Sequence, residues 1–199
     1  PIPIIPEIIR LFVIGNELFN EFNPAEFETF NQTEYSPVDL MAKKWNEASV
    51  SLPLFRLPMS QTTNKNFSSL EQFEDGEIGI YSSHAWFSNV SSMALAITYY
   101  RGYRKNVGTA SEYLELDHAD VIINYRDFNF SGGAQSYDVT SIILHELGHA
   151  IGLHHTANYN SVMYPSLPKN TQRRSLFPSD IADVQSRYSQ GSSAFMTAD

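Results

Sequence analysis

The 199-residue chain contains no cysteine. This absence excludes a disulfide framework, thiolate catalysis and any zinc site with cysteine ligands, so a bound metal must be held by histidine or carboxylate side chains. Basic residues are also scarce, with 13 Lys and Arg against 22 Asp and Glu and a formal charge of −9. Because the charges are spread thinly, without a basic cluster, we expect no nucleic-acid partner.

The sequence also lacks a hydrophobic run long enough to span a bilayer, which needs about 20 mainly apolar residues. The apolar start "PIPIIPEIIRLFVIG" is interrupted by prolines and Glu7 and has no basic leader. We therefore expect no transmembrane segment, and we expect any targeting segment to be absent from this chain. A chain of 199 residues, 42% of them hydrophobic, is long enough to bury a core in one domain or in a domain with two lobes.

Short apolar segments bounded by Gly, Pro, Ser or Asn predict strands. The first is ended by Gly15 and Asn16, and a polar loop rich in Ser, Thr and Asn follows the second. The five segments are "IIRLFVI" (8–14), "LPLFRLP" (52–58), "GEIGIYS" (76–82), "MALAITYYR" (93–101) and "HADVIINY" (118–125).

Three segments have the apolar spacing and the terminal residues of helices. The expected N-caps are Ser36, Asp138, and either Ser179 or Asp180, and Gly152 can end the second helix in the left-handed conformation. Strands and one helix, followed by an irregular segment and a terminal helix, predict an α+β fold. We expect an upper lobe over residues 1–152, a lower lobe over 153–189 and a flexible tail over 190–199.

Four of the six histidines lie in "SIILHELGHAIGLHHTANYNSVMYP" (141–165). On a helix, His145 and His149 at i and i+4 share one face and can bind one ion, and Glu146 can lean over the same site. Zinc suits neutral imidazoles, and a catalytic zinc has three protein ligands with one position open. Because Gly152 allows the chain to turn back, we expect His155 to be the third ligand and His154 to point elsewhere.

The segment "HELGHAIGLHH" resembles the extended zinc-binding motif of the metzincin metallopeptidases. Eight residues after His155, Met163 in "SVMYP" is similar to the Met-turn of these enzymes, and "MYP" looks most like the matrixins, the matrix-metalloproteinase-like branch. The resemblance implies a zincin-like fold with a twisted five-stranded mixed sheet and two long helices above a zinc cleft. The lower lobe would be small and irregular, ending in a C-terminal helix.

The resemblance also implies an activity, zinc-dependent hydrolysis of peptide bonds in extended protein or peptide substrates. His145, His149 and His155 would hold one catalytic zinc ion, Glu146 would be the general base, and Met163 would form a hydrophobic base under the metal. We expect a monomer that is secreted or located in the cell envelope or periplasm, similar to a minimal bacterial matrixin.

Substrate would add a strand to the edge formed by Met93 to Tyr100. We therefore expect Ala94, Leu95 and Ala96 to contact the substrate backbone. By resemblance to matrixins, the segment after the Met-turn walls the main primed-side pocket, which predicts an apolar or aromatic side chain just after the cut. In this chain the wall residues are Tyr164, Pro165, Ser166 and Leu167.

The chain departs from animal matrixins between the third and fourth strands. Their long loop holds a structural zinc and calcium, whereas "SSHAWFSNVSSM" (82–93) is short and offers only His84. We expect no second zinc, and the sequence does not decide whether calcium binds. His84 and His118 have no spaced partner set, which favours surface or packing roles.

Other functions compete with the peptidase hypothesis. A peptidase with a glutamate as third ligand is nearly excluded, because no glutamate follows His155. The fold could instead serve as a non-catalytic, zinc-containing module for peptide binding or adhesion, although such a module would not need Glu146. A purely structural zinc would require a fourth protein ligand, for which His154 is the obvious candidate.

Overall fold

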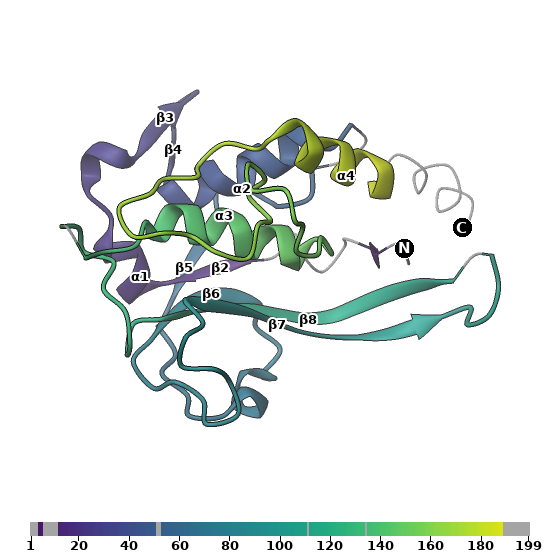
Figure 1. Ribbon diagram of the computed structural model, residues 1–199, viewed down its shortest axis with the longest axis horizontal. Helices are drawn as coiled ribbons and strands as arrows, with labels where there is room; N and C mark the ends of the chain where they lie inside the picture. The colour runs from purple at the N-terminus through teal and green to yellow at the C-terminus, as the bar shows by residue number, and fades with distance from the viewer. Residues whose placement is uncertain (1–3, 6–11, 51–52, 111, 134, 189–199) are drawn as a thin grey trace.

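The computed structural model describes residues 4–5, 12–50, 53–110, 112–133 and 135–188. Its main sheet is covered on one face by two helices that lie side by side (Figure 1). The expected tail, residues 190–199, and most of the expected first strand lie outside the described residues. The strands are β1 (Ile4–Ile5), β2 (Val13–Gly15), β3 (Glu28–Phe30), β4 (Thr33–Tyr35), β5 (Ser60–Thr62), β6 (Gly79–Ser83), β7 (Ala96–Lys105) and β8 (Tyr113–Asn124).

The main sheet is mixed, which confirms the α+β prediction. Its strand order is β7–β8–β6–β2–β5, with β7 antiparallel to β8 and the other neighbours parallel. The short β1 pairs with the beginning of β8, so the described sheet has six strands where five were expected. The helices are α1 (Asn16–Glu21), α2 (Pro37–Ala48), α3 (Val139–Ala150) and α4 (Pro178–Tyr188), with 3-10 turns at Pro24–Glu26 and Leu70–Phe73.

The strand expected at residues 52–58 is wrong. Residues 53–58 form no strand, and the pairing with β2 is made by the polar β5, inside the expected loop. Pro53 and Pro58 have no N–H to donate to a ladder, whereas each residue of β5 can donate one. The hairpin of β3 and β4 was also not anticipated, because its largely exposed side chains carry no apolar alternation.

Helix α2 begins as the sequence predicts. Ser36 accepts a hydrogen bond from the Asp39 N–H at 3.2 Å, and Asp39 accepts one from the Ser36 N–H at 2.8 Å. This reciprocal pair satisfies N–H groups that the first turn leaves without helical partners. Further along, the fully buried Trp45 donates from Nε1 to the Leu144 carbonyl at 2.9 Å. The contact fixes α2 against the middle of α3.

The central strands are buried on both faces. In β6 and β8, Ile80, Val121 and Ile123 belong to the main core, which also contains buried residues of α2 and α3. Their neighbours Tyr81 and Ile122 point to the opposite face, as the two-residue strand period requires. There they pack against loops at the bottom of Figure 1, in a second apolar cluster with Phe73, Trp86 and Phe87. The sheet is therefore packed on both faces, with α3 against one of them.

Helix α4 begins earlier than expected, at Pro178, so neither Ser179 nor Asp180 is its cap. Proline is favoured in the first turn of a helix, where its missing N–H is not needed. Asp180 instead reaches back and accepts from the Phe177 N–H at 2.8 Å. None of the helices in the described ranges has the length and apolar character needed to cross a membrane.

Candidate metal and catalytic site

Helix α3 is anchored at its N-terminus by Asp138, as expected. The carboxylate accepts from the Ser141 N–H at 3.0 Å, which satisfies one donor of the first turn. Arg174 donates to the same carboxylate through Nε at 2.8 Å. This ion pair lowers the pKa of Asp138 against the opposing effect of burial, which keeps the cap charged.

The C-terminal end of α3 turns back at Gly152, which has φ of 87°. The Gly152 N–H donates to the His149 carbonyl at 2.8 Å, and the Leu153 N–H donates to the Gly148 carbonyl at 2.9 Å. Glycine adopts this left-handed conformation without the steric cost that a Cβ imposes. The expected left-handed stop is confirmed, and the chain returns toward the helix face that carries His145 and His149.

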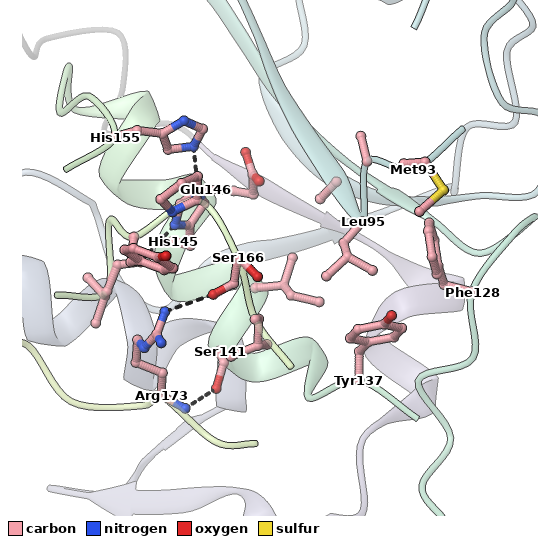
Figure 2. Close-up of a pocket in the computed structure, with 17 residues that line it drawn as sticks. Met93, Leu95, Phe128, Tyr137, Ser141, His145, Glu146, His155, Ser166 and Arg173 are labelled. Carbon is pink, nitrogen blue, oxygen red and sulfur yellow. Dashed lines mark hydrogen bonds between the residues drawn. The ribbon is translucent and has the colours of Figure 1, made fainter. Parts of the chain in front are cut away.

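Three imidazoles converge at this turn. The Nε2 atoms of His145 and His149 are 3.1 Å apart, and that of His155 lies 3.2 Å from the first and 3.1 Å from the second. Figure 2 shows the ring of His155 facing His145. Among the described residues, these three form the one group of His, Asp and Glu side chains that could hold a metal ion. His154 is exposed and outside the group.

The donor set fits a zinc ion. His145 donates from Nδ1 to the Val162 carbonyl at 2.7 Å, and His149 donates from Nδ1 to the Leu153 carbonyl at 2.8 Å. These bonds leave the Nε2 lone pairs free for a metal. Burial lowers the pKa of His145 to about 4 and also lowers that of His149, which favours neutral imidazoles. Nitrogens about 2.0–2.1 Å from a tetrahedral zinc are about 3.3 Å apart, close to the observed spacing.

Glu146 is 5% exposed, and its carboxylate lies beside the three histidines. Thr98 on β7 holds it, because Thr98 Oγ1 lies 2.7 Å from Oε2 and 2.9 Å from the backbone carbonyl of Glu146. Burial raises the pKa of Glu146, while the charge of a protonated His149 and the hydrogen bond from Thr98 act in the opposite direction. A carboxyl group with a raised pKa can exchange a proton near neutral pH.

Met163 is 2% exposed and packs against α3 at Gly148. A Cβ built on Gly148, between the two helical histidines, would lie 2.4 Å from Met163 Sδ and 2.9 Å from Trp45 Cζ2. Only glycine therefore allows Met163 to approach the helix this closely. The Met163 carbonyl accepts from the Thr156 N–H at 3.1 Å, which connects this segment to the chain just after His155.

Asp180 of α4 is hydrogen-bonded to the same segment. It is 1% exposed and accepts from the Val162 N–H at 3.1 Å, and it also bonds to the Ser161 hydroxyl. The carbonyl of Val162 in turn accepts from His145. Through the backbone of Val162, Asp180 of α4 thus helps to orient His145, a candidate metal ligand.

A pocket of about 310 Å³ opens beside the histidines, and we call it the cleft pocket. All seven residues expected to contact substrate line it, together with His145, Glu146 and His155. Figure 2 shows Leu95, Phe128 and Tyr137 across the pocket from His145. The lining residues are Met93, Ala94, Leu95, Ala96, Phe128, Tyr137, Ser141, Ile142, His145, Glu146, His155, Val162, Tyr164, Pro165, Ser166, Leu167 and Arg173.

The edge strand begins later than expected, because residues 93–95 precede β7. Asn124 at the end of β8 fixes residues 94 and 95. Its side chain donates to the Ala94 carbonyl at 3.1 Å, and its N–H donates to the Leu95 carbonyl at 2.9 Å. Regular pairing between β7 and β8 starts only at Ala96. Ala94 and Leu95 therefore lie in an irregular segment that leads into the strand.

The two remaining histidines have surface and packing environments. His118 is 1% exposed, and its Nε2 lies 2.7 Å from Asp120 Oδ2, a hydrogen bond that raises the pKa of the histidine. His84 is exposed, and its ring centroid lies 5.7 Å from that of Tyr125. The expected absence of a second zinc stays a prediction.

With this geometry established, comparison with known proteins identifies the family. The sequence matches the matrixin peptidase family over residues 29–189. The chain belongs to the matrixin family. Matrixins are zinc-dependent, and the three converging histidines of this matrixin lie within the matched range. The resemblance found in the sequence is thereby confirmed for the fold family.

Several curated relatives, two of them named metalloendoproteinases, are similar to this matrixin over part of their length. Metalloendoproteinase 1 of Glycine max is 34% identical over 62 residues, 31% of this chain and 20% of that protein. Metalloendoproteinase 1-MMP of Arabidopsis thaliana is 37% identical over 75 residues, 38% and 20% of the two chains. Matrilysin of Felis catus is 38% identical over 53 residues, which are 26% of this chain and 20% of that protein. The matches thus span about a fifth of these relatives.

Sequence reasoning missed two polar residues of the site. Thr98 lies in the expected edge strand, two positions after Ala96 and hence on the same face, so the strand period carried a signal that could have found it. Arg173 lies in an irregular segment without any periodic pattern, and nothing local indicates that it lines the cleft pocket. Its position depends on a tertiary contact, the 2.6 Å hydrogen bond from its N–H to Ser141 Oγ.

Proposed function

We propose that this matrixin is a zinc-dependent endopeptidase that hydrolyses peptide bonds of extended protein or peptide substrates. The observation that carries the proposal is the convergence of three Nε2 atoms within 3.2 Å of one another beside the buried carboxylate of Glu146. The site is open to the cleft pocket, so a substrate can reach it. A purely structural zinc would be closed by a fourth protein ligand, and His154 is outside the group.

His145, His149 and His155 would hold one zinc ion, and Met163 would form the apolar floor beneath it. When bound, a zinc ion supplies a lowered pKa for water and polarisation of the scissile carbonyl. The Nδ1 hydrogen bonds of His145 and His149 keep both rings in the orientation and tautomer that ligation needs.

Glu146 would act as general base. Its carboxylate takes a proton from the attacking water and later gives that proton to the leaving amine. Two features support this role: burial raises the pKa of Glu146, and the hydrogen bond from Thr98 fixes one carboxylate oxygen. The second oxygen remains available for the proton.

The substrate would bind as an added strand along the outer edge of β7. Within the described residues β7 pairs only with β8, so its other edge can accept main-chain hydrogen bonds from a peptide, which give affinity without requiring a sequence. Ala94, Leu95 and Ala96 would contact the peptide backbone. The residues Tyr164, Pro165, Ser166 and Leu167 would wall the primed-side pocket.

We propose a two-lobed catalytic domain at residues 1–189, with α2 and α3 as the long helices of the upper lobe. The division falls near Gly152, where α3 has ended and the irregular segment starts. We further propose that the protein is a monomer and that it works outside the cell or in the cell envelope, as the resemblance implies.

A cleavage assay with metal removal tests the proposal. The purified protein should cleave an unstructured protein such as casein, lose activity after dialysis against a chelator, and regain it when about one equivalent of zinc is added. His84→Ala is the matched control, because this histidine lies outside the metal group and its loss should change nothing. A zinc-loaded protein that cleaves no protein or peptide would favour a non-catalytic peptide-binding module.

A further inference from the structure

Arg173 is the one cationic side chain among the residues that line the cleft pocket. Figure 2 shows it extending from the backbone near Ser141 to Ser166, with Leu95 and Tyr137 across the pocket. Apart from Glu146 at the catalytic centre, no lining residue carries a carboxylate. The pocket therefore combines largely apolar walls with a single positive charge.

Contacts with two tyrosines and a backbone carbonyl hold the guanidinium in place. Its Cζ lies 5.3 Å from the ring centroid of Tyr159 and 5.7 Å from that of Tyr164. Its Nη1 donates to the Ser166 carbonyl at 3.1 Å. Both distances are within the range of cation–π contacts. Of the five N–H donors on its edge, this one bond occupies one, which leaves a fork for an oxygen ligand.

No carboxylate of the described residues forms an ion pair with Arg173, although the chain is acidic. The neighbouring Arg174 pairs with both Asp138 and Glu26. An unpaired guanidinium at the wall of a partly enclosed, mainly apolar pocket attracts an anionic group strongly, because it is less screened than at an open surface. Arginine matches the two oxygens of a carboxylate with two parallel hydrogen bonds.

We propose that Arg173 makes this peptidase select substrates with an acidic side chain, glutamate above all, directly after the cleaved bond. The inference rests on the proposed function and on the assignment of the cleft pocket to the primed side. The two methylene groups of glutamate pack on the apolar walls, while its carboxylate binds the free edge of Arg173. From the sequence we expected an apolar or aromatic substrate side chain after the cleaved bond, and this proposal replaces that expectation.

Four peptides that differ only in the residue after the scissile bond test the proposal. With Glu, Gln, Leu or Phe at that position, the wild-type protein should show the highest kcat/KM for Glu, at least about tenfold above its neutral isostere Gln. Raising the salt concentration should lower the ratio of kcat/KM for the Glu peptide to that for the Gln peptide. The comparison needs no variant, so it holds even where a substitution at position 173 prevents folding.

Variants then assign the preference to one side chain. Arg173→Met should reduce kcat/KM for the Glu peptide at least tenfold and leave the Leu peptide within about threefold, whereas Arg173→Lys should keep an intermediate preference. Arg56→Met removes the same charge from an exposed position outside the pocket, and it should leave the ratios unchanged.

The possible failures are distinguishable. Cleavage of all four peptides with Leu or Phe preferred over Glu would overturn the role of Arg173 and leave the peptidase function intact. An equal loss for all four peptides in Arg173→Met would show that the residue only braces the segment from Tyr164 to Ser166, which also overturns the proposal. The absence of cleavage of every peptide and of casein by the zinc-loaded protein would instead contradict the proposed function itself.

Discussion

At the scale of single residues, two adjacent histidines have opposite environments. Both are exposed, but the Nε2 atom of His155 lies within 3.2 Å of two other imidazoles, whereas His154 is outside the group. We predict that His155→Ala loses zinc, because two remaining imidazoles hold the ion weakly, and that His154→Ala retains about one zinc per chain. Metal analysis after dialysis measures both. Equal zinc loss in the two variants would contradict the assignment.

The hydroxyl of Thr98 contacts the proposed base, and Thr98 is outside the group of candidate metal ligands. Thr98→Val keeps the shape of the side chain but removes the 2.7 Å hydrogen bond to Glu146, so we predict about a tenfold fall in kcat with little change in KM. Thr98→Ser restores a hydroxyl and should recover most of the activity. Steady-state kinetics of the three proteins provide the measurement. A Ser variant as impaired as the Val variant would show that only packing matters.

The convergence of the three candidate metal ligands could be predicted from the sequence because their geometry is local. The helix period fixes the relation of His145 to His149, and a glycine at position 152 permits the turn that returns His155. Thr98 and Arg173 reach the site from elements distant in sequence, through contacts with Glu146 and Ser141. Such contacts depend on the packed structure. The strand period places Thr98 on the same face as Ala96 but does not indicate its contact with Glu146, and no local pattern indicates Arg173.

At the scale of elements, α3 and the Met163 segment approach one another through Gly148. We predict that Gly148→Ala lowers the free energy of unfolding by about 1–2 kcal/mol, because overpacking against Met163 and Trp45 outweighs the higher helix propensity of alanine. Urea denaturation measures the change. In a Met163→Ala background the penalty should be smaller, because the sulfur contact is gone. Strict additivity of the two substitutions would contradict the contact.

The strands show where local pattern fails. β6 and the second half of β8 are buried on both faces, and their apolar sequences predicted both strands, although β8 begins at Tyr113, five residues before the predicted start at His118. β5 is a polar three-residue edge strand whose pairing with β2 depends on the neighbouring strand rather than on its own side chains. The apolar segment before it was mistaken for the strand because Leu54 and Phe55 are core residues in an irregular conformation. Burial alone does not distinguish a strand from an apolar loop.

At the scale of the whole molecule, a zinc ion would join the end of α3 to the segment that returns after Gly152. A ligand that binds only the folded state stabilises it by about 2.7 kcal/mol at a hundredfold excess over its Kd. For a domain of this size, chelation should therefore lower Tm by roughly 5–10 °C. Calorimetry with and without chelator tests this, with His155→Ala as a control that should not respond. An unchanged Tm after verified zinc removal would contradict the coupling.

The central claim is that Glu146 performs the chemistry at a zinc site held by three histidines. Glu146→Gln keeps the size and most hydrogen bonds of the side chain but cannot take a proton from water. Zinc content and peptide turnover should be measured on the same preparation of this variant. We predict about one zinc per chain and a kcat/KM at least about 100-fold below wild type. A variant that retains zinc and cleaves within a few-fold of wild type would contradict the account.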